Sequence, residues 1–211
     1  MRTLRNLAYF AVGIFLAASF LLGTTSVRAD HTVSHSVRQV TVSVSALRLK
    51  TSEFTITCTA VMLQPERAIT ANHCTRDDTL LLTINGKEYP VLESYANPDR
   101  DLAILIVPNA PCPCAYIRVK PAQLDEEIVL VGYPHGQLQS LAYGRVQGRV
   151  GVGTVREQLV TSAIGAPGKS GGGVFDRDGY LLAIATQMGP YGQLTYADEI
   201  TPTVLKGKGS P

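Results

Sequence analysis

Three side chains that lie far apart in the sequence are of the types that acyl transfer requires. Ser170 lies in the glycine-rich stretch GAPGKSGGG, His73 lies near the end of AITANHC, and Asp101 begins the apolar stretch DLAILIV. A serine hydroxyl is a weak nucleophile until a base takes its proton, and that base must be held in one tautomer by a third group. The residue types therefore predict Ser170 as the nucleophile, His73 as the base and Asp101 as the group that orients the base.

The same serine lies in a second pattern. AIGAPGKS (163–170) matches a loose form of the phosphate-binding loop, in which Lys169 would contact a nucleotide phosphate. That loop needs a strand before it, a helix after it and a parallel sheet around it. Three glycines, 171–173, follow Ser170, and each disfavours a helix by about 1 kcal/mol relative to alanine. Nucleotide binding is therefore not expected, and no cofactor is predicted.

The elements that must position these residues are predicted to be strands. Apolar residues recur at every second position or form short buried runs, which is typical of β-strands. Three stretches show this pattern: 40–47, 54–63 and 127–134. Residues 173–187 are expected to form a hairpin that turns at Asp176-Arg177-Asp178-Gly179. Asn85-Gly86 between two β-rich runs predicts a hairpin, and short helical pieces are expected at 71–75 and after Thr201. Many short strands with closely spaced turns predict an all-β barrel or sandwich.

The N-terminus predicts export. Arg2 and Arg5 precede an apolar run, 7–23, and Val27-Arg28-Ala29 has the form of a signal-peptidase site, so residues 1–29 are expected to be a signal peptide. The alternative is an uncleaved membrane anchor through the apolar run, which is near the minimum length for a spanning helix. Either way the rest of the chain is expected outside the cytosol, secreted or periplasmic.

Composition and cysteine spacing exclude some partners. With 19 Lys and Arg against 17 Asp and Glu among 211 residues, the charge gives no case for nucleic acid. Exported cysteines usually pair, and Cys58–Cys74 is the favoured bridge among the three possible connectivities. Cys112 and Cys114, in PCPC, are expected to be free or bonded in an unusual way. No metal site is predicted, because the cysteines lack C-x-x-C spacing.

Five segments together resemble the chymotrypsin-fold (trypsin-like) serine proteases, most closely the bacterial HtrA-type branch without its PDZ module. They occur in the family's order: TAVMLQPERAITANHC, DRDLAILIV, EEIVLVGYPHG, SAIGAPGKSGGGVFDRDGYLLAIAT and LTYADEI. The resemblance implies two packed antiparallel β-barrels with the active site in the cleft between them. The implied protease domain covers 36–205, with a first barrel at about 36–120, a second at about 121–205, and a flexible tail at 206–211.

The resemblance also implies the role of each site residue. Ser170 would attack the scissile carbonyl of a polypeptide substrate, His73 would transfer the proton, and Asp101 would orient His73. The backbone N–H groups of Gly168 and Ser170 would form the oxyanion hole, where glycines admit the backbone conformations that converging amides need. Ile164 and Leu194 would lie near the specificity pocket, which implies cleavage after small or medium apolar residues.

Some residues depart from the family pattern. Asn72 stands where alanine usually precedes the histidine, Gly173 replaces a common proline, and Lys169 stands where zymogen-type members have an aspartate. A lysine cannot pair with a newly cut N-terminus, so activation by that route is not expected. Asp99 is a rival to Asp101. The alternative function is a catalytically inactive, protease-like module that only binds peptides or partners.

Overall fold

The structure is a computed structural model of the chain. It describes five ranges: 43–50, 55–76, 79–97, 99–152 and 156–200. The expected signal peptide at 1–29, the helical piece after Thr201 and the tail at 206–211 lie outside the described residues. Within the described ranges, no helix is long and apolar enough to cross a membrane.

The first half of the described chain forms a seven-stranded antiparallel sheet with the order β5-β4-β1-β2-β3-β7-β6. Its strands are β1 (Val44–Lys50), β2 (Thr55–Gln64), β3 (Arg67–Ala71), β4 (Leu80–Ile84), β5 (Lys87–Pro90), β6 (Glu93–Ala96) and β7 (Leu102–Ile106). Alternate residues such as Leu80, Leu82 and Ile84 are buried while their neighbours are half-buried. The period-two pattern therefore covers one face of the sheet with the apolar core.

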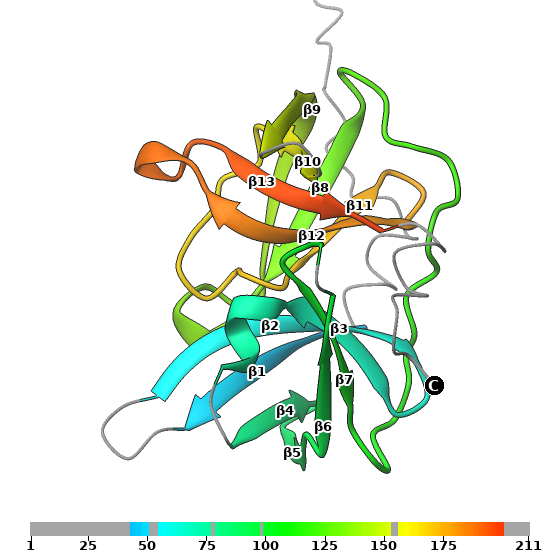
Figure 1. Ribbon diagram of the computed structural model, residues 1–211, viewed down its shortest axis with the longest axis vertical. Helices are drawn as coiled ribbons and strands as arrows, with labels where there is room; N and C mark the ends of the chain where they lie inside the picture. Colours follow the sequence, from blue (N-terminus) through cyan, green and yellow to red (C-terminus); the bar gives the residue numbers. More distant parts are fainter. Residues whose placement is uncertain (1–42, 51–54, 77–78, 98, 153–155, 201–211) are drawn as a thin grey trace, which may run out of the picture. The chain divides into compact units, whose positions relative to one another are not determined.

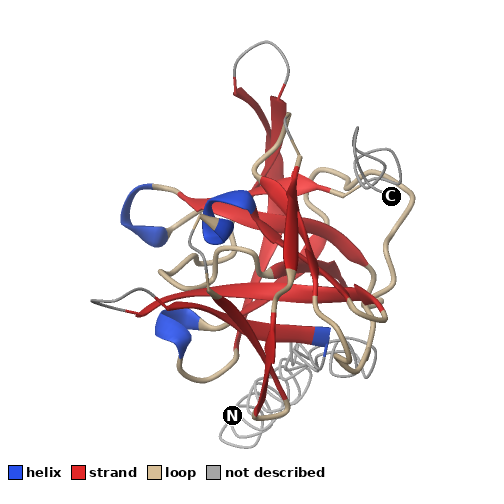
Figure 2. Ribbon diagram, turned by 60° about the horizontal axis from the view of Figure 1, so that its bottom comes forward, coloured by secondary structure: helices blue, strands red, loops and turns tan. Residues whose placement is uncertain are grey.

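The second half forms a closed six-stranded barrel in the order β10-β13-β12-β11-β8-β9. Its strands are β8 (Glu127–Gly132), β9 (Ser140–Val152), β10 (Arg156–Thr161), β11 (Gly173–Asp176), β12 (Leu181–Met188) and β13 (Thr195–Glu199). Figure 1 shows β1–β7 on one side and β8–β13 on the other, and Figure 2 shows that strands dominate, with only short helical turns. The predicted all-β, chymotrypsin-like fold class is confirmed, with the first sheet open and the second closed.

Two predicted hairpin turns are confirmed. Asn85 and Gly86 connect β4 to β5 with φ values of 51° and 77°, as a tight two-residue hairpin requires. Between β11 and β12, the Asp176 carboxylate accepts hydrogen bonds from the backbone N–H groups of Asp178 and Tyr180. Each turn is fixed by local chemistry, which is why the sequence predicts it.

The two halves pack through a shared apolar core. Val61 and Ile69 from the first sheet lie in one buried cluster with Val131, Phe175 and Ile184 from the barrel. Burying apolar area at this seam contributes about 25 cal/mol for each Å² removed from water. The seam fixes the position of one half relative to the other, so it also fixes residues that the two halves bring to a common site.

Candidate active site

His73 and Asp101 meet because β3 and β7 are paired. Ala71 at the end of β3 lies opposite Leu102 at the start of β7, so the residues just beyond these positions share one edge. His73 Nδ1 lies 2.8 Å from Asp101 Oδ2, and the His73 backbone N–H donates to Asp101 Oδ1 at 2.9 Å. Both side chains are partly buried. The Asp101 carboxylate thus bonds to both the backbone and the ring of His73, and fixes the orientation of the ring.

Asn72 fits the turn that carries His73. The two residues begin a short 3-10 helix, Asn72–Thr75. The Asn72 N–H donates to the backbone oxygen of Asp101 at 3.1 Å, and Thr75 Oγ1 donates to the backbone oxygen of Asn72 at 2.8 Å. The departure from alanine at this position therefore leaves the local geometry ordered rather than perturbed.

Ser170 lies on a loop of the barrel that is bonded to both halves. The Thr59 N–H on β2 donates to the Ser170 backbone oxygen at 2.7 Å, and the next residue, Gly171, donates to Ala185 on β12 at 2.7 Å. Cys74, the neighbour of His73, has its sulfur 3.9 Å from the same Ser170 oxygen. The loop is thereby held directly against the segment that carries His73.

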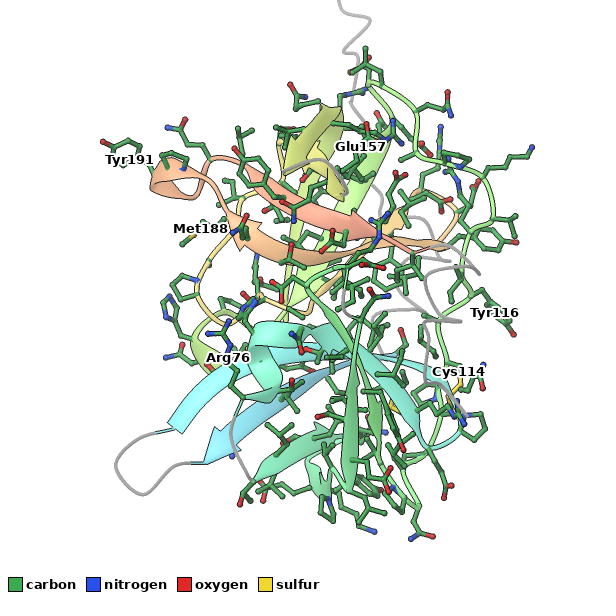
Figure 3. All side chains as sticks on the ribbon, in the orientation of Figure 1. Arg76, Cys114, Tyr116, Glu157, Met188 and Tyr191 are labelled. Atoms are coloured by element: carbon green, nitrogen blue, oxygen red, sulfur yellow. A yellow bond between two sulfur atoms is a disulfide. The ribbon has the colours of Figure 1, made fainter. Side chains whose placement is uncertain are left out.

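A groove of about 760 Å³ brings the three residues to one surface. His73, Asp101 and Ser170 all line it. Arg76 and Met188, which lie on the same side of the molecule in Figure 3, also belong to its lining. Among the described residues no hydrogen bond joins the Ser170 hydroxyl to His73, and such bonds often shorten only when substrate binds. Asp99 lines the groove too but is exposed.

The loop before Ser170 fixes the direction of the Gly168 N–H group. The Pro167 carbonyl accepts a hydrogen bond from His135 N–H at 2.8 Å; because a trans peptide directs its C=O and N–H oppositely, the Gly168 N–H is directed away from His135. Gly168 has φ of 92°, and a Cβ there would lie 2.5 Å from the Tyr133 oxygen. In the described part of the chain, the N–H groups of Gly168 and Ser170 have no acceptor.

Thr59 fastens this loop to the first sheet through its side chain as well as its backbone. Its hydroxyl donates to the Gly168 oxygen at 2.8 Å and accepts from the Tyr133 N–H at 3.0 Å. The residue is fully buried. A single hydroxyl therefore satisfies two backbone groups of the barrel, a role that the residue type alone does not predict.

Replacing Thr59 tests how much these two hydrogen bonds contribute to stability. Thr59→Val removes the hydroxyl and should lower the free energy of unfolding by about 1–3 kcal/mol for each of the two buried groups left without a partner. Thr59→Ser keeps the hydroxyl and loses one methyl group, which corresponds to about 1 kcal/mol. Chemical denaturation measures both, and equal losses in the two variants would show that the hydroxyl contributes nothing.

A family model described as the trypsin-like peptidase domain matches residues 58–184, the stretch that carries His73, Asp101 and Ser170. The chain belongs to this family. Serine protease Rv3671c of Mycobacterium tuberculosis is 24% identical over an alignment of 137 residues, and the match covers 60% of this chain and 34% of that protein. The chain therefore spans about a third of the length of the curated relative it matches.

Solved structures show the same fold. The active form of the Rv3671c protease from M. tuberculosis superposes with a TM-score of 0.72 at 21% identity, covering 78% of this chain and 79% of that one. HtrA-type protease AlgW, solved with a tripeptide, gives a TM-score of 0.74 at 23% identity, covering 83% of this chain and 62% of that one. The peptidase thus has the fold of HtrA-type proteases.

The placement of Ile164 and Leu194 near the specificity pocket stays a prediction. Ile164 is 64% exposed, and neither it nor Leu194 is among the residues that line a small pocket of about 20 Å³ beside Ser170. This small pocket is bounded by nine residues: Leu130, Gly165, Ala166, Lys169, Ser170, Ala185, Gln187, Met188 and Thr195. The loop before Ser170 directs the Ile164 side chain outward, which residue type alone does not reveal.

The four cysteines form two disulfides in the structure. Cys58 joins Cys74 with a Cα–Cα distance of 6.2 Å, and Cys112 joins Cys114, which is the second of the two expectations for that pair. In Figure 3, Cys114 lies on the opposite side of the view from Arg76 and the groove. His73 nitrogen and the Cys58 and Cys74 sulfurs lie within 4.8 Å of one another, but the two sulfurs bond to each other and are not free to hold a metal.

The two bridges should differ in their contribution to stability. Replacing Cys58 and Cys74 by alanine should lower the free energy of unfolding by about 3 kcal/mol, because this bridge closes a loop of 16 residues' separation. The same replacement at Cys112 and Cys114, separated by two residues, should cost about half as much. Denaturant unfolding under oxidising conditions measures the difference, and the reverse ranking would refute it.

One contact between the two halves, beside the site, is not predictable from the sequence pattern. Arg100, next to Asp101, has its guanidinium 3.8 Å from the carboxylate of Asp198, which is fully buried on β13. Asp198 looks like an ordinary polar strand residue in the sequence. Its burial opposite an arginine from the other half depends on how the halves pack, which no local pattern encodes.

Proposed function

We propose that the peptidase is an exported serine endopeptidase that hydrolyses peptide bonds through a Ser170-His73-Asp101 triad and an acyl-enzyme. One observation carries the proposal: the 2.8 Å pairing of His73 with Asp101 lies in the same groove as Ser170. Family membership supports it, because the matched segment contains all three residues. A polypeptide bound in this groove is the proposed substrate.

In the proposed mechanism, His73 Nε2 takes the proton of the Ser170 hydroxyl as the oxygen attacks the substrate carbonyl carbon. The carbonyl oxygen becomes an oxyanion that accepts hydrogen bonds from the N–H groups of Gly168 and Ser170. His73 then gives the proton to the leaving amine, which forms the acyl-enzyme. Water attacks the ester by the same route, and Asp101 stabilises the imidazolium in both halves of the reaction.

The proposed export of the protein is supported by the charged and apolar segments of residues 1–29. The buried Cys58–Cys74 bridge agrees with an oxidising compartment. We therefore place the mature peptidase outside the cytosol, secreted or periplasmic, with a membrane tether through 7–23 as the alternative. Sequencing the N-terminus of the protein purified from its producing cells separates cleavage after Ala29 from retention of the segment.

A fluorophosphonate probe tests the activity directly. The activated Ser170 hydroxyl should displace fluoride from the probe and remain covalently labelled, as mass spectrometry of the Ser170 peptide would show. Ser170→Ala and His73→Ala should not be labelled, because one lacks the nucleophile and the other the base. A folded wild-type chain that neither labels nor cleaves peptides would instead be the inactive, peptide-binding module.

A further inference from the structure

Lys169 is a buried cation that the proposed mechanism does not use. Its exposed fraction is 7%, and its ammonium donates one hydrogen bond, at 3.2 Å, to the neutral carbonyl of Ile164. An ammonium has three N–H donors. Among the described residues, no carboxylate forms an ion pair with Lys169, and burial lowers the pKa of its ammonium with no neighbouring charge to offset the effect. The lysine is therefore a buried charge without a counter-charge.

Such a residue is expected to cost stability. Removing an ammonium from water is unfavourable unless an opposite charge compensates, and an apolar side chain of the same length would avoid this cost. The site itself is apolar: Leu130 and Ala185 line the small pocket that Lys169 also lines, and a Cβ at Gly132 would lie 3.2 Å from Lys169 Cγ. Uncompensated charges in proteins concentrate at functional sites.

Its position in the chain indicates what the charge can act on. Lys169 lies between Gly168 and Ser170, whose N–H groups have no acceptor in the described part of the chain. Its side chain turns back to Ile164 within the same loop, and its own N–H donates to the Ala166 oxygen at 3.0 Å. The cation is therefore fixed within the loop that forms the proposed oxyanion hole.

We propose that the Lys169 ammonium stabilises, through space, the negative charge that develops on the substrate carbonyl oxygen during attack by Ser170. This inference rests on the proposed function. The N–H groups of Gly168 and Ser170 contact the oxyanion, and Lys169 supports them without touching substrate. Because the cation is already fixed in an apolar surrounding, its field acts without reorganisation when the charge forms. The lysine would then lower stability in the resting protein while it raises turnover.

Lys169→Met separates this role from a packing role, because the two predict opposite stability changes. The substitution keeps an unbranched side chain, one atom shorter, and removes the charge. We expect kcat on a peptide substrate to fall about tenfold with KM within about twofold, as for a group that acts in the transition state. Tm should rise by about 2–4 °C, which is the shift for a modest gain in stability at this chain length. Lys120→Met, the same change at an exposed position, should alter neither quantity.

A peptidyl trifluoromethyl ketone gives a second measurement that reports the oxyanion alone. The Ser170 oxygen bonds to the ketone carbon, the C=O π pair becomes the oxyanion, and the hydroxyl proton passes to His73. Lys169→Met should weaken this inhibitor about tenfold. The matching trifluoromethyl alcohol, which cannot form an oxyanion, should bind wild type and variant equally.

Three results would overturn the inference. Unchanged kcat and inhibitor affinity in Lys169→Met would show that the charge is not used. A lower Tm, or failure of the variant to fold, would show that Lys169 is a packing residue. Equal weakening of the ketone and the alcohol would indicate a distorted pocket. If wild type is active and labelled, these results refute the inference alone; if wild type is neither, the proposed function fails and the inference falls with it.

Discussion

Replacing Asp101 with asparagine should lower kcat by about 10⁴-fold while the protein stays folded. The asparagine oxygen can still accept the His73 backbone N–H that Asp101 Oδ1 now accepts at 2.9 Å. Its amide nitrogen would then face His73 Nδ1, which now lies 2.8 Å from a carboxylate oxygen. An amide can only donate there, so the ring proton would move to Nε2, and His73 could no longer take the proton of Ser170.

The measurement is steady-state hydrolysis of a peptide substrate, with Tm recorded to show that the fold survives. Asp99→Asn is the matched control, because Asp99 lines the same groove but is exposed and does not contact His73 in the described hydrogen-bond network. The control should keep kcat within about twofold. If Asp99→Asn instead causes the larger loss, the assignment of the orienting carboxylate is wrong.

Replacing Gly171 with alanine should destabilise the peptidase by at least about 4 kcal/mol, at the extreme of single substitutions. Gly171 has φ of 83°, and a Cβ there would lie 1.9 Å from the Thr59 oxygen and 2.2 Å from Thr70 Oγ1. The backbone of β2 cannot move away easily, because Thr59 is bonded to the loop at both Gly168 and Ser170, directly before Gly171. The clash would therefore separate the loop that carries Ser170 from the first sheet.

Gly86→Ala isolates backbone strain from this clash. Gly86 has a similar φ of 77°, but nothing lies within 4 Å of a Cβ built there. The Gly86→Ala variant should lose only about 1–2 kcal/mol of unfolding free energy, because alanine is strained in the left-handed conformation. Denaturant unfolding of the two variants gives the comparison, and a loss for Gly171→Ala no greater than for Gly86→Ala would refute the steric argument.

The sequence predicted those features that depend on local pattern. Period-two alternation predicted β2, and the turn residues Asn85-Gly86 and Asp176–Gly179 predicted two hairpins, because side-chain direction and turn geometry follow from neighbouring residues. The pairing of His73 with Asp101 was predicted from residue type and from resemblance. The β3–β7 register brings those two residues to the same edge.

Features that depend on packing between the halves were not predicted. Thr59 is one of several threonines in TITCT, and nothing in that stretch distinguishes it from Thr57, which is only half-buried. Its role follows from the face of β2 that meets the barrel. The exposure of Ile164 likewise follows from the path of a loop whose glycines permit many conformations.

The Cys58–Cys74 bridge has a consequence for the timing of activity. Cys58 precedes Thr59, which fastens the nucleophile loop, and Cys74 follows His73. One covalent bond therefore ties down the neighbours of two site residues at once. A newly made chain whose thiols are still reduced would lack this restraint. The proposed cleavage of polypeptides would then begin only after the chain reached oxidising surroundings, and not inside the cell that produces it. Comparing hydrolysis before and after reoxidation of the reduced protein would reveal such a delay.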